Sequence, residues 1–337
     1  MNRNHSADGV KFFACLAVVL MHVSNYLPAT GRATYWNYYW YFPILDLGVP
    51  LFFAMAGYFI APRVQDEAYL LKYGLRILEI NIAYTIFYLL FYWPLDTMEQ
   101  LLRGQTFGNA IQQHLTELKW TDFLTGVIGS EHLWYLMALF IAVMVFYLLR
   151  HWSLSFPVIM TISTVTYLLT FTPVLQPLMD NVLIYGGFVK GLFYLLIGYT
   201  VANKKLTLPY PKSMIVASVV ALILVDTFSD NLLFREVFLA LSTFSIVVFI
   251  SNNPGKANFF SKVGGQYSLG IYLLHILFVG GFNVLLRIFP VLLSINDIVR
   301  IIGVTAVAMI GSVLLYPFTT RFFYKPVENI LAKRLIK

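Results

Sequence analysis

Long apolar runs recur along the whole chain and constrain its fold more than any other feature. An α-helix rises 1.5 Å per residue, so about 20 apolar residues cross the ~30 Å hydrocarbon core of a bilayer. The runs lack the strict alternation that a transmembrane β-barrel requires. They predict an all-α, polytopic integral membrane helix bundle with about ten transmembrane helices. The runs extend roughly over residues 10–27, 45–61, 75–93, 133–149, 156–171, 185–202, 213–228, 232–250, 268–289 and 298–318.

The composition fits a protein whose surface faces lipid. Of the 337 residues, 59% are hydrophobic and only 12% are charged, which is too little charge to cover the surface of a soluble protein of this length. The net charge of +7 comes from Lys and Arg residues scattered through short loops, so a nucleic-acid partner is not expected. Cys15 is the lone cysteine, which excludes an intrachain disulfide and a cysteine metal site.

The distribution of Lys and Arg predicts the orientation of the chain. With a cytoplasmic N-terminus and ten alternating helices, sixteen of the 23 basic residues fall on the inner side, six fall on the outer side, and Lys190 falls within a span. This excess predicts that both termini are cytoplasmic. The six outer residues are Arg32, Arg103, Lys119, Arg235, Arg287 and Arg300.

The longest connection is an extracytoplasmic loop at about residues 94–131. Its apolar residues recur at helical spacing, which predicts one helix lying in the outer membrane interface. Gly187 and Gly191 form a GxxxG step, which predicts close helix packing. Neither an internal repeat nor a long linker is present, so one transmembrane domain is predicted over residues 1–337. The apolar loop residues are Met98, Leu101, Leu102, Ile111, Leu115 and Leu118.

Ionisable residues inside membrane spans are costly, so each is a functional candidate. Lys11 and His22 lie eleven positions apart on the first predicted helix, which places them on one face, about 16 Å apart along the axis. Lys11 then lies near the cytoplasmic surface, where Asp8 can pair with it, and His22 lies in the outer half of the bilayer. His22 fits a catalytic base or an interhelical hydrogen-bonding residue, whereas Lys11 alone fits a snorkelling lysine.

Two further histidines point to the same zone. His132, beside Glu131, begins the fourth predicted helix, and His275 lies about halfway along the ninth. Separately each fits a structural role, but three histidines in one cavity would supply a base or nucleophile near neutral pH. Their spread over three helices gives no metal-ligand spacing, so no metal is expected. The other histidines, His5, His114 and His151, are predicted to lie in loops.

Basic residues also gather on the predicted cytoplasmic side, at Arg63, Lys72 and Arg76. Glu79 follows Arg76 at i+3, so an ordinary surface ion pair is one interpretation. The other is a cationic cradle for an anionic cytosolic ligand such as a phosphorylated cofactor. The sequence contains neither a phosphate-binding glycine loop nor a GxSxG serine elbow, which argues against a nucleotide-driven pump and a serine hydrolase.

An ordered set of sequence blocks resembles the acyltransferase-3 family of integral membrane acyltransferases over nearly the whole chain. "DGVKFFACLAVVLMH" is similar to the first-helix signature of the family, although Lys11 stands where Arg is usual. "LGVPLFFAMAGYFIAPR" and "LLKYGLRIL" are similar to the next two blocks, with Lys72 and Arg76 four apart in place of RxxR. "HLWYLMAL" and "YSLGIYLLH" are similar to later blocks. Many relatives carry an additional C-terminal SGNH domain, for which this sequence has no room.

The resemblance implies transfer of an acetyl or other acyl group from cytosolic acyl-CoA, here acetyl-CoA, to a hydroxyl of a surface polysaccharide or lipid-linked glycan. It implies a multi-pass protein of the bacterial inner membrane. The implied catalytic residues are His22, as base or transient acyl carrier, supported by His132, Glu131 and His275. The implied CoA-binding residues are Lys11, Arg63, Lys72 and Arg76.

Two other classes of function remain open. A transporter or flippase of a lipid-linked sugar or small metabolite also needs a helical bundle with a polar lining, although the sequence shows no inverted repeat of the kind such proteins often have. The other class is a membrane protein that has the same fold but no catalytic activity and acts only as a binding partner of other proteins.

Overall fold

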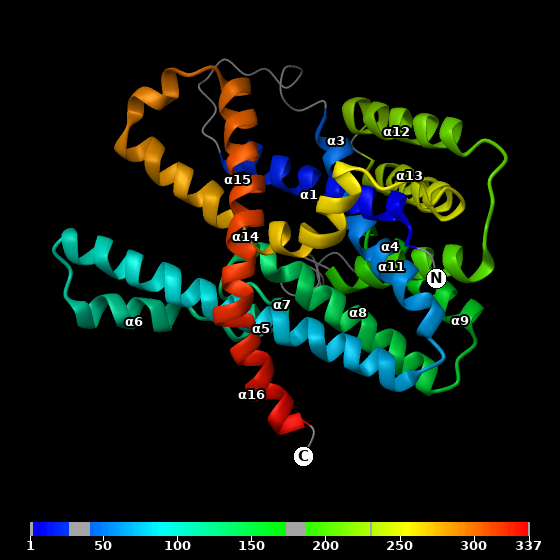
Figure 1. Ribbon diagram of the computed structural model, residues 1–337, viewed down its shortest axis with the longest axis horizontal. Helices are drawn as coiled ribbons and strands as arrows, with labels where there is room; N and C mark the ends of the chain where they lie inside the picture. The colour runs from blue at the N-terminus through cyan, green and yellow to red at the C-terminus, as the bar shows by residue number, and fades with distance from the viewer. Residues whose placement is uncertain (1–2, 27–40, 173–186, 230, 336–337) are drawn as a thin grey trace. The chain divides into compact units, whose positions relative to one another are not determined.

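The computed structural model describes residues 3–26, 41–172, 187–229 and 231–335, and these ranges are helical, without a strand (Figure 1). The prediction of an all-α fold is thereby confirmed. The helices are α1 (His5–Tyr26), α3 (Phe42–Leu45), α4 (Gly48–Ile60), α5 (Glu67–Leu102), α6 (Phe107–Glu117), α7 (Trp120–Thr125), α8 (Trp134–His151), α9 (Phe156–Leu169), α11 (Gly187–Lys204), α12 (Pro211–Phe228), α13 (Leu232–Asn252), α14 (Phe259–Ile288), α15 (Asp297–Thr319) and α16 (Lys325–Leu335).

Eight helical stretches in the described part of the chain are long and apolar enough to cross a membrane. They confirm a polytopic helical membrane protein. Two more helices, α9 and α11, lie where the fifth and sixth spans are predicted, and α9 is only 14 residues long. The predicted total of about ten spans therefore stays a prediction. The predicted sixth span also begins at residue 185, which lies outside the described residues.

The chain divides into two compact units, which are described separately. The first unit comprises Met1–Gln65 and Phe193–Phe318, and the second comprises Asp66–Leu192 and Thr319–Lys337. The boundaries between the units fall within α11 and at the end of α15. The prediction of one domain over residues 1–337 stays a prediction.

In the first unit, α1 and α14 pack side by side and run in the same direction. The rings of Phe12 and Phe260 lie 5.1 Å apart near the start of both helices. Further along, the Cys15 thiol donates to the backbone carbonyl of Ser268 at 3.3 Å. Apolar residues of both helices and of α15 form one buried cluster, which includes Val23, Ile271 and Val304. This cluster positions the C-terminal half of α1 against the middle of α14.

Two glycines let α4 and α11 approach closely within the first unit. A methyl group on Gly57 would lie 2.7 Å from the carbonyl carbon of Leu195, and one on Gly198 would lie 2.6 Å from that of Ala54. Real side chains do not approach backbone atoms so closely. Only glycine therefore allows this contact, in the manner of small-residue packing between membrane helices.

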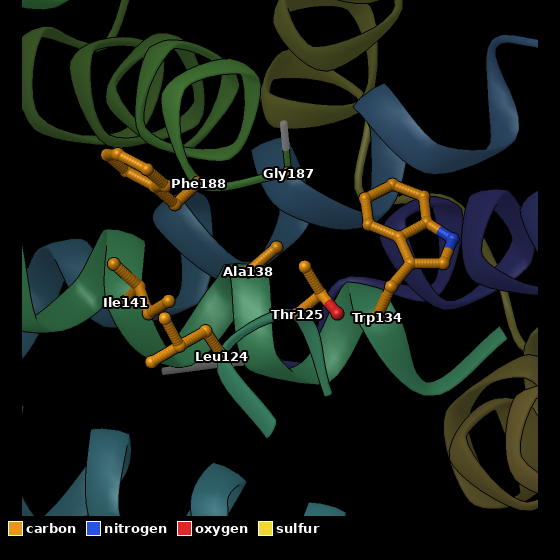
Figure 2. A pocket seen from close by; sticks show the side chains of 7 residues that line it. All are labelled: Leu124, Thr125, Trp134, Ala138, Ile141, Gly187 and Phe188. Atoms are coloured by element: carbon orange, nitrogen blue, oxygen red, sulfur yellow. The ribbon is translucent and has the colours of Figure 1, made fainter. Parts of the chain in front are cut away.

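In the second unit, α8 packs against α5 and also receives the start of α11. Figure 2 shows Gly187 of α11 beside Ala138 and Trp134 of α8, and a methyl group on Gly187 would lie 2.9 Å from the Trp134 ring. These residues line a cavity of only about 20 Å³, which has room for about one water molecule. Close packing at Gly187 is thus confirmed, and the same prediction for Gly191 is not tested.

The helix predicted in the 94–131 loop is present as α6, which carries Ile111 and Leu115, and its position at the membrane interface stays a prediction. The assignment of Met98, Leu101 and Leu102 to that helix is wrong. Instead, α5 continues through Pro94 to Leu102, and α6 lies alongside its C-terminal end (Figure 1). Proline removes only one backbone donor and therefore does not always end a helix. Pairs at i,i+4 stabilise the extension, because Gln100 donates to Asp96 at 2.7 Å and Arg103 pairs with Glu99.

The loop placement of His114 is also wrong. A left-handed turn at Gly104 (φ 86°) precedes α6, and the Thr106 side chain caps the helix by accepting from the amide of Asn109. His114 lies on the inner face of α6, where its Nε2 is 3.0 Å from the Thr97 hydroxyl. The loop prediction is wrong for the other two histidines as well, because His5 is the first residue of α1 and His151 is the last residue of α8.

Candidate active site

A pair of histidines meets in the first unit, between α1 and α14. The rings of His22 and His275 lie 5.1 Å apart and are tilted by 48°. His275 is completely buried and His22 is half-buried. The structure therefore brings together two of the three histidines that the sequence selects. Because they come from distant parts of the chain, the packing of α1 against α14 creates the site.

The backbone of α14 determines which nitrogen of His275 carries the proton. Its Nδ1 lies 2.7 Å from the carbonyl oxygen of Tyr272 and 3.0 Å from that of Ile271. A carbonyl oxygen only accepts hydrogen bonds, so Nδ1 must be the donor. In a neutral imidazole the lone pair is then on Nε2. His275 thus has a defined ring orientation and an acceptor nitrogen.

Apolar side chains surround the histidine pair. Val19 and Val23 precede and follow His22 on α1, Ile271 and Val279 lie one turn from His275 on α14, and all four are buried. Few groups of this cluster can solvate a charge, so electrostatic and hydrogen-bonding interactions between the imidazoles and a reacting group are stronger there than in water.

Basic residues lie at the start of α1. Lys11 Nζ is 2.7 Å from Asp8 Oδ1, which confirms the predicted pair, and Arg3 Nε is 2.7 Å from Asp8 Oδ2. Two cations thus share one carboxylate and leave a net positive charge. Lys11 Nζ also lies 4.8 Å from the ring centre of Phe59 near the end of α4. Arg63 is four residues after Phe59, in the short 3₁₀ turn that follows α4. Lys11 and Arg63 are therefore at the same end of the first unit.

The other two predicted cofactor residues lie on α5 of the second unit, and both are exposed. Lys72 lies one turn before Arg76. Arg76 makes a side-chain hydrogen bond with Tyr324 and interacts electrostatically with Glu79 and Glu328. These contacts fit the ion-pair interpretation of Arg76. The cationic cradle stays a prediction.

His132 and Glu131 belong to the second unit, in the short 3₁₀ turn that precedes α8. His132 is buried, with Nδ1 2.9 Å from the Ser130 hydroxyl and its ring edge-to-face with Tyr88. Glu131 is exposed. These contacts position His132 firmly. The predicted gathering of three histidines in one cavity stays a prediction.

A buried arginine of α15 was not singled out from the sequence. The Arg300 side chain is 1% exposed and pairs with Asp297 through Nη2, while Nε and Nη1 have no hydrogen-bond partner among the described residues. Arg300 lies one turn before Val304 of the histidine-pair cluster. The i,i+3 spacing from Asp297 is the sequence signal for the ion pair. Its burial depends on tertiary packing.

A second cluster missed from the sequence joins three helix ends of the first unit. Arg235 at the start of α13 pairs with Asp46, with Asp226 at 2.6 Å and with Glu236 at 3.1 Å. Asp46 follows α3 and Asp226 lies near the end of α12, so one arginine ties these ends together. Within the described ranges no group of three or more His, Cys, Asp or Glu residues is arranged to hold a metal ion. The expectation of no metal stays a prediction.

The fold and the histidine pair define a polytopic α-helical membrane protein with a buried imidazole site. The acyltransferase-domain family of the acyltransferase-3 type matches residues 4–317. The chain therefore belongs to the acyltransferase-3 family and is a multi-pass membrane acyltransferase, as the sequence blocks predict. No curated protein and no solved structure matches the chain.

Proposed function

We propose that the protein is a membrane-bound O-acetyltransferase that moves an acetyl group from cytosolic acetyl-CoA to a hydroxyl of a glycan on the other side of the membrane. The observation that carries the proposal is the contact between His22 and His275. Membership of an acyltransferase family supplies the reaction class. The two imidazoles, 5.1 Å apart, supply groups that can move a proton or carry an acyl group near neutral pH.

Two routes use the same pair. In the direct route, His22 takes the proton of the glycan hydroxyl while that oxygen attacks the thioester carbonyl. The C–S bond breaks, CoA leaves as the thiolate, and the proton passes from the imidazolium to the thiolate. In the covalent route, the lone-pair nitrogen of His22 attacks the thioester carbonyl, the C–S bond breaks, and CoA leaves as a thiolate that takes the proton from the other ring nitrogen. The glycan hydroxyl then attacks the acyl-imidazole, the C–N bond breaks, and the hydroxyl proton returns to the His22 ring. In both routes His275, whose Nε2 is the acceptor nitrogen, orients His22.

The donor approaches from the side of Lys11. On α1 this residue lies about 16 Å along the axis from His22, a span that the extended pantetheine arm of CoA can bridge. Lys11 and Arg63 are at one end of the first unit and bind the phosphates. Lys72 and Arg76, on the second unit, stay predicted ligands. Lysine binds phosphate as a point charge, without the bidentate geometry of arginine.

The acceptor is a surface polysaccharide or lipid-linked glycan, and the protein acts in a bacterial inner membrane. The sequence blocks also resemble the O-acetyltransferase that decorates enterobacterial common antigen, which makes that polymer the first acceptor to test. The transporter alternative predicts movement of unmodified substrate in vesicles without acetyl-CoA. Family membership favours acyl transfer.

The decisive test uses purified protein in vesicles with labelled acetyl-CoA on the Lys11 side and glycan on the other. His22→Ala is expected to lower acetylation by at least about 100-fold, the range for loss of a general base. His5→Ala, on the same helix, is the matched control and retains activity. Label on His22 supports the covalent route, and labelled glycan alone supports the direct route. Unchanged acetylation by His22→Ala would overturn the proposal.

A further inference from the structure

One face of α15 packs onto the helices of the histidine pair and begins with a buried arginine. Arg300, Val304 and Ala308 follow each other at intervals of four positions, so they share one face of the helix. Val304 and Ala308 belong to the buried apolar cluster around the histidine pair. Arg300 therefore lies one turn beyond that cluster, on the face of α15 that packs against it.

The side of α14 that carries His275 also has a polar residue just beyond the cluster. His275, Val279 and Asn283 follow each other at intervals of four positions and share one face. Val279 belongs to the same apolar cluster, and Asn283 lies one turn further on. The Oδ1 atom of Asn283 is buried and has no hydrogen-bond partner among the described residues. Each helix thus places a buried polar group one turn beyond the apolar contacts.

Arg300 has more hydrogen-bond donors than the described residues satisfy. Its side chain is 1% exposed, Nη2 pairs with Asp297, and Nε and Nη1 have no partner in the described part of the chain. Nε carries one N–H group and Nη1 carries two, and a guanidinium never accepts a hydrogen bond. Buried donors without an acceptor cost free energy and are rare in native structures. The side chain is therefore suited to a ligand that supplies oxygen atoms.

Arg300 and the basic start of α1 lie on opposite sides of the histidine pair. The helices α1 and α14 begin side by side. A methyl group on Gly270 of α14 would overlap the ring of Tyr316. Further along α14, the Phe278 ring would overlap a methyl group on Gly311, so positions towards the end of α14 lie beside positions towards the start of α15. Arg300 precedes Gly311 by eleven positions and is therefore further from the start of α1 than Phe278.

We propose that Arg300 and Asn283 bind hydroxyl groups of an uncharged sugar in the acceptor glycan. This inference rests on the proposed function, in which the donor approaches from the Lys11 side and the acceptor from the other side. A sugar hydroxyl accepts a hydrogen bond from a guanidinium N–H and can also donate one to an amide oxygen. The hydroxyl groups of a sugar therefore satisfy both kinds of buried atom.

The charge of the ion pair disfavours an anionic sugar. The Asp297 carboxylate cancels the charge of the Arg300 guanidinium, so the pair offers no net positive charge. A carboxylate or phosphate bound to Arg300 would repel Asp297, and the apolar surroundings screen this repulsion poorly. An anionic oxygen also has no proton to donate to Asn283 Oδ1. An uncharged hydroxyl group meets neither cost.

Arg300→Lys separates ligand binding from the ion pair. Lysine keeps a cation for Asp297 but loses Nε and the planar fork of donors. The KM for a neutral glycan acceptor is expected to rise at least about tenfold, while the KM for acetyl-CoA and the Tm stay unchanged. Asn283→Leu repeats the test from α14. Thr305→Val is the matched control, because Thr305 also has a buried hydroxyl without a described partner but lies about 140° around α15 from Arg300.

Thermal stabilisation tests the site without measuring catalysis. Purified full-length protein in detergent is heated with oligosaccharides of glucose or N-acetylglucosamine, or with the same oligosaccharides after oxidation of one primary alcohol to a carboxylate. A neutral oligosaccharide is expected to raise the Tm, because a ligand that binds only the folded state stabilises it. The concentration that gives half of this shift is expected to be at least about tenfold higher for the carboxylate form, and for Arg300→Lys with the neutral form.

The outcomes separate the two proposals. Unchanged acceptor KM in both Arg300→Lys and Asn283→Leu, or no preference for neutral over anionic oligosaccharides, would overturn the sugar site while acetylation supports the function. A rise in the KM for both substrates together with a lowered Tm would indicate a packing role and also overturn the site. Stabilisation by a neutral oligosaccharide that Arg300→Lys weakens, without acetylation of any acceptor, would support the site and overturn the function.

Discussion

At His275, two backbone carbonyls hold the proton on Nδ1 and leave Nε2 as the acceptor. The arrangement matches that of histidines whose second nitrogen does the chemistry while the first is anchored. The anchoring groups belong to the same helix, so α14 alone presets the residue before any ligand binds.

His275→Gln and His275→Phe are predicted to differ in activity. Glutamine can still offer an acceptor oxygen, so kcat is expected to fall about tenfold, whereas phenylalanine loses the acceptor and kcat falls at least about 100-fold. The KM for acetyl-CoA is expected to stay constant in both, because Lys11 and Arg63 are untouched. Steady-state kinetics of the purified variants measure these effects. Equal loss of kcat in both variants, with an equally lowered Tm, would indicate a packing role only.

The residues that sequence reasoning selected correctly depend on local spacing. Asp8 and Lys11 are one helical turn apart, and their pair follows from helix geometry alone. Burial of His114 and Arg300 depends on which helix lies opposite, and one sequence does not reveal this. The contact of His22 with His275 is also tertiary. The sequence indicated two polar residues of similar depth, and only the packing of α1 on α14 shows that they meet.

At the scale of helices, glycine determines how closely α4 and α11 approach. The sequence draws attention to Gly187 and Gly191 because their spacing is recognisable. The contact at Gly57 and Gly198 has no such spacing, since its two glycines lie on different helices. The continuation of α5 past Pro94 was missed because proline usually marks a helix end. The side-chain pairs that stabilise the extension, Asp96 with Gln100 and Glu99 with Arg103, lie after the proline.

Gly57→Ala is predicted to destabilise the protein by about 1–3 kcal/mol, because the added methyl group meets the backbone of α11 and the helices must separate. Gly303→Ala is the control, since nothing lies within 4 Å of a methyl group there. Thermal unfolding in detergent is expected to show a lower Tm for Gly57→Ala and an unchanged or higher Tm for Gly303→Ala. A Tm unchanged by Gly57→Ala would contradict the close contact of α4 with α11.

For the whole molecule, the sequence predicts the helical membrane fold well because hydrocarbon as solvent leaves few alternatives. Charge asymmetry predicts the orientation, which stays a prediction. The division into two compact units was not predicted, since it depends on contacts between helices far apart in the sequence, such as α1 with α14. The histidine site shares this origin and was predicted only in part.

The orientation is tested with an engineered cysteine on each side, because the native Cys15 is buried. In sealed vesicles with the predicted extracytoplasmic face outward, an impermeant maleimide is expected to label Gln112→Cys in α6. It is expected to label Lys256→Cys, between α13 and α14, only after permeabilisation. The unmodified protein should stay unlabelled. The reverse labelling pattern would place the termini outside the cytoplasm and contradict the charge argument.

The pairing of α1 with α14 has a consequence for biosynthesis. Cys15 and Ser268, which join the two helices, are 253 residues apart. The ribosome releases α1 early, and its partner enters the membrane only after most of the chain has been made. A truncated chain that ends before α14 therefore contains Lys11 and Arg63 but has no histidine pair. Prematurely terminated chains therefore lack the paired-imidazole site, whatever they bind.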